Sequence, residues 1–259
     1  MAPKLVVNWV FPDLLSLYGD RGNLMALSRL GERLGWEVVI NRVDDPAEAG
    51  PADLAVFNSG DLDLIAVLAG RRDALLRCCE RARQVVVFGT TVALFSTMTH
   101  RVGHPDVAGL NLIPAVLQEQ TIDLTHIEHP YADDLLLQLP ALGTGDELSP
   151  FGLAAGVYVK SVRVELDPAV APFAKVLYGL DNTGTQRHAG WDGARHGNLL
   201  WTNLLGPAFV RNPWLALSVV GQATGTTIPV TDDLVESWAL EQQSMASFRA
   251  FVATKLPRA

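Results

Sequence analysis

Cysteine is scarce in this sequence. Only Cys78 and Cys79 occur among 259 residues, and they are adjacent. Neighbouring cysteines on one helix cannot form a disulfide framework, and no second pair is present to complete a zinc site. Isolated cysteines are also common as buried packing residues. The sequence therefore excludes small disulfide-rich and zinc-finger folds, and we expect both thiols to be structural.

Blocks of positive charge and long apolar runs are absent as well. The chain has 28 acidic and 20 basic residues, which gives a net charge of −8, and no run of Lys or Arg. This balance argues against a nucleic-acid-binding surface. No apolar run reaches the roughly 20 residues of a membrane-spanning helix, and the first residues lack a signal-peptide pattern. We expect a cytoplasmic protein with no membrane span and no nucleic-acid partner.

Apolar residues are abundant and regularly arranged. They make up 49% of the chain, enough for one large core, so we expect a single domain over residues 1–259. Short apolar runs typical of buried strands alternate with segments of helical periodicity. The strands are expected at 5–10, 37–40, 54–57 and 85–88, and the helices at 23–34 and 72–84. This alternation predicts an α/β fold with a doubly wound, mostly parallel sheet.

The centre of the predicted sheet is the strand 85–88. It is followed by Gly89, which permits a tight turn, and by Thr90 and Thr91, either of which could cap a following helix. The carboxyl end of such a strand is where open α/β sheets bind ligands. We therefore expect the functional site at this elbow, with Phe88 at its apex. Phe88 cannot act as a nucleophile, an acid or a metal ligand.

The second half of the chain is less regular. We expect loops at 100–114 and 128–150, and antiparallel strands at 157–164 and 173–178 that extend the sheet. A further strand is expected at 199–205 and a helix at 212–223. Thr231 begins a C-terminal helix over 231–255, whose apolar residues recur on one stripe.

Residues 17–27 read LYGDRGNLMAL, the first of four short motifs that share one resemblance. This segment resembles the opening loop and helix of the GatD family, whose members work with the Mur ligase MurT. The family's glycine-rich loop corresponds to residues 58–61, its Phe-Glu-Asn-His-Gly segment to residues 180–184, and its Leu-His-Gly-Pro segment to residues 204–207. The resemblance covers the chain from about residue 5 to residue 223.

This resemblance implies a class I, CobB/CobQ-like glutamine amidotransferase of flavodoxin-like architecture. In the family, an elbow cysteine attacks the glutamine amide and a histidine activates the thiol. The ammonia passes to MurT, which amidates the D-glutamate of lipid II in peptidoglycan synthesis. The implied partner is a MurT-like Mur ligase, and the implied chemistry needs no cofactor and no metal.

The catalytic positions of the family are substituted in this chain. The family elbow reads Cys-Gly-Gly-Tyr-Gln where residues 88–92 of this chain read FGTTV, so Phe88 stands at the cysteine. The histidine corresponds to Leu205, and an ungapped alignment from Gly109 onward places Asp123 at the arginine that binds the substrate carboxylate. A thiolate and its base are both required for cysteine catalysis. We therefore expect no catalytic residue, and these substitutions argue against glutamine binding.

Two further sets of residues follow from the resemblance. The former oxyanion and substrate pocket is assigned to Asn58, Ser59, Gly60, Asp61, Gly89, Thr90 and Asp123. The candidate partner-contact loop is assigned to Tyr18, Asp20, Arg21 and Asn23. Alternatively, this loop only folds the turn, with Asp20 bonded to nearby amides and Asn23 capping the helix.

Two other functions remain open at this stage. The chain could be a working glutaminase subunit, with catalytic groups from residues aligned elsewhere or from the partner. It could also be a rewired hydrolase, which needs a hydroxyl and a histidine in contact. The candidates for these roles are Ser59, Thr90, Thr91, His100, His104, His126, His129, His188 and His196. His126 and His129 lack a third ligand of obvious spacing for a metal.

Overall fold

The main sheet has the strand order expected of a flavodoxin-like fold. We describe a computed structural model, which defines residues 2–121, 132–140 and 150–256. The sheet order is β13-β14-β4-β3-β1-β2, and all neighbours are parallel except β13 and β14. Its strands are β1 (Lys4–Val10), β2 (Glu37–Val43), β3 (Ala52–Phe57), β4 (Ala82–Phe88), β13 (Ala194–His196) and β14 (Leu199–Thr202). The predicted parallel sheet and the interior position of β4 are confirmed.

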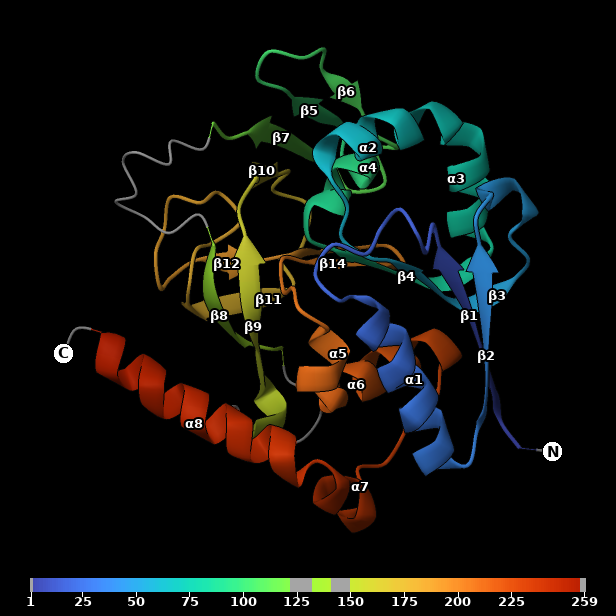
Figure 1. The fold of residues 1–259 in the computed structure, drawn as a ribbon, viewed down its shortest axis with the longest axis vertical. Coiled ribbons are helices and arrows are strands. Elements are labelled where there is room, and N and C mark those ends of the chain that lie inside the picture. Colours follow the sequence, from blue (N-terminus) through green and yellow to red (C-terminus); the bar gives the residue numbers. More distant parts are fainter. Residues whose placement is uncertain (1, 122–131, 141–149, 257–259) are drawn as a thin grey trace.

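Helices cover both faces of this sheet (Figure 1). One face carries α1 (Arg21–Leu34), α5 (Ala208–Arg211) and α6 (Pro213–Thr224), and the other carries α2 (Leu62–Leu68), α3 (Arg72–Glu80) and α4 (Val92–Phe95). The side chains of β4 alternate between two cores, with Val86 and Phe88 toward α5 and α6 and with Val85 and Val87 toward α3 and α4. The apolar run of β4 is thus explained by burial on both faces.

Helix α1 ends where the sequence predicts. Gly35 adopts a left-handed φ of 67°, and its N–H bonds to the carbonyls of the last turn. Such a conformation favours glycine because other residues are strained there. Helix α3 is shorter than expected, because it ends at Glu80 and β4 begins at Ala82.

The expected antiparallel extension is built mainly as two separate small sheets. One has the order β10-β7-β5-β6 and the other β12-β11-β8-β9. Their strands are β5 (Met98–His100), β6 (Val107–Ala108), β7 (Ala115–Glu119), β8 (Ala132–Gln138), β9 (Leu153–Val159), β10 (Val162–Leu166), β11 (Ala174–Tyr178) and β12 (Trp191–Asp192). The expected single strand 157–164 is wrong, because Lys160 and Ser161 separate two strands in different sheets. The expected loop 128–150 is also wrong over β8.

The C-terminal segment forms two helices instead of one. Helix α7 (Asp232–Ser237) and helix α8 (Ala239–Lys255) are separated by Trp238, whose φ of −103° and ψ of 17° break the helical path. Trp238 is buried against Trp214 and Phe151, so aromatic packing holds the break. Thr231 accepts the capping bond from Leu234 N as expected. Among the described residues, no helix is long and apolar enough to cross a bilayer.

Candidate functional site

The elbow after β4 has Gly89 at its apex, not Phe88. Phe88 is extended, with φ −112° and ψ 138°, and its ring packs edge-on against Phe209 on α5 at 5.5 Å between centroids. Gly89 adopts a left-handed φ of 57°. Elbow nucleophiles sit on such a strained strand-to-helix turn, so the position comparable to a nucleophile is Gly89. The assignment of Phe88 to the apex is therefore wrong, and the apex has no side chain.

Apolar and hydroxyl groups close over this apex. A Cβ on Gly89 would lie 2.7 Å from Leu205 Cδ2 and 2.7 Å from Ser59 Oγ, which is closer than real Cβ contacts. On the backbone side, Trp201 Nε1 donates to the carbonyl oxygen of Gly89 at 2.9 Å. Leu205 thus lies beside the elbow, where the resemblance implies a histidine, and it offers no basic group.

The two threonines of the elbow do not cap a helix. Thr91 Oγ1 donates to the carbonyl oxygen of Asn58 at 2.7 Å, and Thr90 Oγ1 lies 3.0 Å from Ser161 Oγ. The segment after Gly89 is a short 3-10 turn, η3 (Gly89–Thr91), followed by the four residues of α4. The expected cap is wrong because both hydroxyls bond across the fold instead of along the chain.

Two of the four residues assigned to the candidate partner-contact loop are buried and bonded within the fold. Asp20 and Asn23 are 1% and 0% exposed. Asp20 Oδ2 accepts from Ser59 N at 3.1 Å, and Asn23 bonds both Asn58 Oδ1 and the backbone N–H of Phe209. Neither residue can contact a partner, so their assignment to a partner surface is wrong. Asn23 also lies inside α1 and is not its cap.

Tyr18 and Arg21 remain accessible in this loop. Arg21 is exposed and Tyr18 is half-buried. Of the residues assigned to the former pocket, Asn58, Ser59 and Gly60 are buried beside the elbow.

Two other assigned pocket residues lie elsewhere. Asp61 is exposed and caps α2 by accepting from Asp63 N at 2.8 Å, so its place in the pocket is wrong. Asp123 lies outside the described residues.

Burial changes the acidity of Asp20. Desolvation raises the pKa of this carboxyl to about 6, although hydrogen bonds from the backbone N–H groups of Ser59 and Tyr18 oppose the shift. The Asp20 carboxylate accepts a hydrogen bond from the backbone N–H of Ser59, in the loop that forms one wall of the elbow. This hydrogen bond links the start of α1 to the elbow.

A second polar cluster lies where β14 ends. Asp192 is fully buried and accepts from Thr202 Oγ1 at 2.6 Å and from Asn203 Nδ2 at 3.0 Å. Asn182 exchanges two 2.8 Å hydrogen bonds with the backbone of Gly193. These contacts join the motif at 180–184 to the end of β14, and we call Lys160, Asp181, Asn182, Asp192, Thr202 and Asn203 the Asp192 cluster.

Lys160 is the cation of the Asp192 cluster. It is 2% exposed, and its Nζ has no hydrogen-bond partner among the residues that the structure describes. Desolvation lowers the pKa of Lys160 to about 8, and the charges of Asp192 and Asp181 limit the fall. Desolvation raises the pKa of Asp192 in turn. Within the described residues, the cluster holds opposite charges near one another without a direct ion pair.

No sequence motif marks Lys160, Asp192 or Asn203 as a site residue. One signal was available for Lys160, because a lysine between the apolar runs that became β9 and β10 is unusual. Asp192 follows an exposed Trp191 and precedes a glycine, so its neighbours resemble a surface turn. Its burial is produced by β14, which lies later in the chain.

A rewired hydrolase is not assembled in the described part of the chain. The ring of His100 contacts Asp106, that of His188 contacts Gly179 N, Arg187 and Tyr178, and no described histidine bonds to a hydroxyl. His126 and His129 lie outside the described residues. The described residues contain no group of His, Cys, Asp and Glu side chains that could hold a metal.

The two thiols are also unsuited to catalysis. Both are buried on α3, and desolvation raises the pKa of Cys78 to about 11 and that of Cys79 further.

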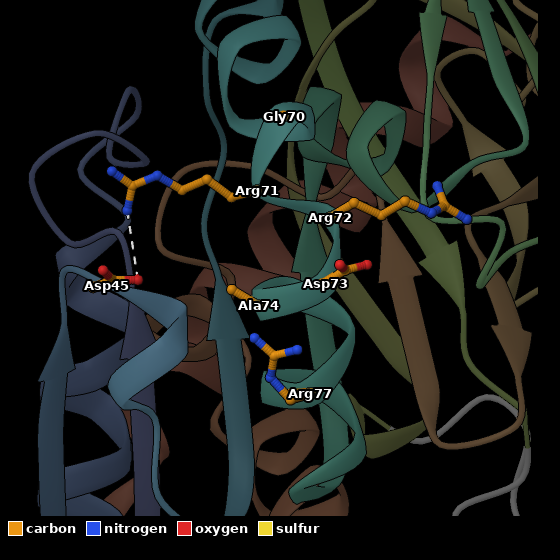
Figure 2. Close-up of a pocket in the computed structure, with 7 residues that line it drawn as sticks. All are labelled: Asp45, Gly70, Arg71, Arg72, Asp73, Ala74 and Arg77. Atoms are coloured by element: carbon orange, nitrogen blue, oxygen red, sulfur yellow. Dashed lines mark ion pairs between the residues drawn. The ribbon is translucent and has the colours of Figure 1, made fainter.

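A pocket beside the start of α3 is rich in arginine (Figure 2). The side chain of Arg71 reaches Asp45 at 3.6 Å, and that of Arg72 points the opposite way, where it donates to the carbonyls of Gly109 and Leu110. Arg77 is exposed. Since two of the three guanidinium groups bind this chain itself, the pocket is not the main candidate site.

Solved glutamine amidotransferases have a similar architecture. A crystal structure of a glutamine amidotransferase matches with a TM-score of 0.58 at 18% identity, over 84% of this chain and 98% of that chain. The glutaminase domain of Trypanosoma brucei CTPS with bound acivicin matches with a TM-score of 0.51 at 11% identity, over 87% and 96%. This chain has the class I glutamine amidotransferase fold. No family model and no curated protein matches it.

Proposed function

We propose that the chain is a cytoplasmic, GatD-like subunit that binds a MurT-like Mur ligase and performs no glutamine hydrolysis of its own. Its role is to stabilise or regulate the ligase in the amidation of the D-glutamate of lipid II. The amidotransferase-type fold and the four motifs support the family, and the elbow supports the loss of activity.

One observation carries the proposal: the apex Gly89 has no side chain, and Leu205 and Ser59 occupy the space above it. A glutaminase of this class needs a thiolate to attack the amide carbon and a base to take and return the proton. Gly89 and Leu205 provide neither group. The buried and protonated Cys78 and Cys79 cannot replace them.

The test is release of glutamate and ammonia from glutamine, measured for the chain alone and for its complex with the MurT-like ligase. We expect a stable complex and turnover at the uncatalysed rate in both samples. Glutamine-dependent turnover by the complex would overturn the loss of activity and favour a glutaminase completed by the partner. Failure to bind the ligase would overturn the proposed partner.

A restoring variant sharpens this test. Gly89→Cys alone supplies a thiol that is mostly protonated at neutral pH, because an unperturbed thiol has a pKa of about 8.5. We expect no turnover from it. Gly89→Cys combined with Leu205→His adds the base. The increase in turnover rate over the single variant measures how much of the missing activity is due to these two positions.

A further inference from the structure

A groove separates α1 from the junction of α7 and α8. Its cavity volume is about 640 Å³, and Figure 1 shows α6 between α1 and the start of α8. We call it the α1–α8 groove. Its lining includes Met25, Arg29, Arg33, Phe209, Trp238 and Glu241. The floor is apolar because Phe209 and Trp238 are buried there.

The two walls of the groove carry opposite charge. On the α1 wall, Arg29 is compensated by Glu32 at 2.6 Å, whereas Arg33 is exposed and has no ion-pair partner in the described chain. On the other wall, Glu241 lines the groove from the first turn of α8, which follows the acidic helix α7. No ion pair joins the walls within the described residues. The chain therefore presents a free cation and an acidic wall on the same surface.

Glu241 is incompletely satisfied in the isolated chain. Its Oε2 atom is buried, and no donor reaches it among the described residues. A buried carboxylate oxygen without a donor destabilises the fold. Glu241 lines the groove, so a guanidinium that enters from outside would supply that donor once the carboxylate rotates to expose this oxygen.

Exposed apolar side chains surround the groove. Met25 and Val210 are 65% and 42% exposed, and Leu240, next to Glu241, is 77% exposed. Only Met245 and Val252 of the 17 residues of α8 are buried. Helix α8 thus runs along one edge of the molecule with most of its surface uncovered (Figure 1). Exposed apolar groups rimmed by charge are typical of protein interfaces.

We propose that the α1–α8 groove is a homodimer interface, in which Arg33 of one copy pairs with Glu241 of the other. A two-fold contact is reciprocal, so each surface must contain both complementary features. The groove meets this condition, because a free guanidinium lies on one wall and an unsatisfied carboxylate on the other. The projecting Leu240 of each copy then covers apolar surface of its mate.

The mass of the unsubstituted chain in solution decides the proposal directly. Light scattering or sedimentation should give twice the 28.0 kDa of one chain at micromolar concentration. Raising the salt concentration should weaken the association, because part of the contact is electrostatic. A monomer at concentrations up to about 100 µM would overturn the proposal and leave the groove to another protein.

Charge reversal identifies the contact. Arg33→Glu and Glu241→Arg should each weaken dimerisation by at least about 30-fold, because each like-charge contact occurs twice in the dimer. An equal mixture of the two variants should form a heterodimer, since both contacts then join opposite charges. Dimers that persist in the single variants, or a mixture that stays monomeric, would overturn the assigned pair.

A matched control tests the specificity of the charge effect. Arg77→Glu and Glu80→Arg reverse exposed charges on α3, which covers the other face of the sheet. They should leave the dimer intact. Far-UV circular dichroism of each variant verifies that it is folded, and loss of the dimer in the α3 variants would also overturn the proposal.

Discussion

The elbow and the Asp192 cluster both lie at the carboxyl ends of neighbouring parallel strands, β4 and β14. The two regions bury groups of different chemistry. At the elbow, the apex is a glycine covered by Leu205 and by the hydroxyl of Ser59. In the Asp192 cluster, a lysine and a carboxylate are both buried. The elbow therefore presents no acidic or basic side chain at its apex, while ionisable groups gather at the end of β14, where the resemblance assigns no role.

The difference shows why a perturbed pKa is not by itself a sign of catalysis. Lys160 and Asp192 have the shifted pKa values that often mark functional sites. However, the oxygens of Asp192 accept hydrogen bonds from Thr202 and Asn203, which fix the end of β14. The cluster therefore holds together strands from distant parts of the chain, and its charges are expected to matter for stability first.

The largest effect is expected from Asp192→Leu. This change leaves the buried ammonium of Lys160 without its strongest compensating charge, so the free energy of unfolding should fall by about 3–5 kcal/mol. Urea unfolding followed by circular dichroism measures it. Adding Lys160→Met should recover part of the loss, because both charges are then absent. A loss below about 1 kcal/mol would show that the cluster does not depend on this charge.

At the elbow, Gly89→Ala should lower the free energy of unfolding by about 3 kcal/mol. The left-handed φ strains an alanine, and its Cβ would collide with Leu205 and Ser59. Gly197→Ala is the matched control, because Gly197 has a φ of 58° and open space around it. This control measures the cost of the left-handed φ alone, without a steric clash. Equal losses in the two variants would contradict the crowding at the elbow.

Local patterns were sufficient to predict the five parallel strands of the main sheet, but not the antiparallel strand β13. Strands β1, β3 and β4 are apolar runs buried on the sheet, and Gly35 ends α1 through its own backbone conformation. Such features depend on neighbours in sequence. The break at Trp238 could not be predicted in this way, because it depends on packing against Phe151 and Trp214.

The sequence predicts where the candidate site lies, but not which residues form it. The strand-to-turn pattern located the elbow, but a single sequence does not show which residue takes the left-handed conformation. The burial of Asn23 depends on a hydrogen bond to Phe209, which is 186 residues away. The pairing of Thr91 with Asn58 and the cover of Leu205 over Gly89 are likewise long-range contacts. None of them leaves a local pattern.

A smaller effect is expected from the pH dependence of Asp20, an acid that accepts a hydrogen bond from Ser59 in the elbow wall. Its pKa is about 6 in the folded chain, compared with 3.8 for an ordinary, solvent-exposed aspartate. The folded state therefore binds the proton more tightly, so this carboxyl stabilises the fold below about pH 4 and loses that contribution as the pH rises through 6. The full change should amount to about 3 kcal/mol, of which about 2 kcal/mol falls between pH 4 and pH 7.

Asp20→Asn tests this pH dependence because the amide does not titrate. The difference in unfolding free energy between the variant and the natural chain should shift by about 2 kcal/mol in favour of the variant from pH 4 to pH 7. NMR titration of the Asp20 carboxyl carbon gives the midpoint independently. Parallel stability profiles for the two proteins would mean that the carboxyl is not desolvated as the structure indicates.

The smallest effect on stability is expected from Arg21→Ala, which examines the accessible part of the loop beside the elbow. Arg21 is the first residue of α1, is exposed, and shares its first turn with no acidic residue. A cation at a helix N-terminus opposes the helix dipole, so its removal should change stability by less than about 0.5 kcal/mol, in the stabilising direction. An exposed arginine that does not stabilise its own helix is a candidate contact for a partner.

We expect Arg21→Ala to weaken binding of the MurT-like ligase by about tenfold, whereas Arg77→Ala on α3 should not. Calorimetric titration of both folded variants decides between the interpretations, since unchanged affinity for Arg21→Ala would leave the loop as a fold element only.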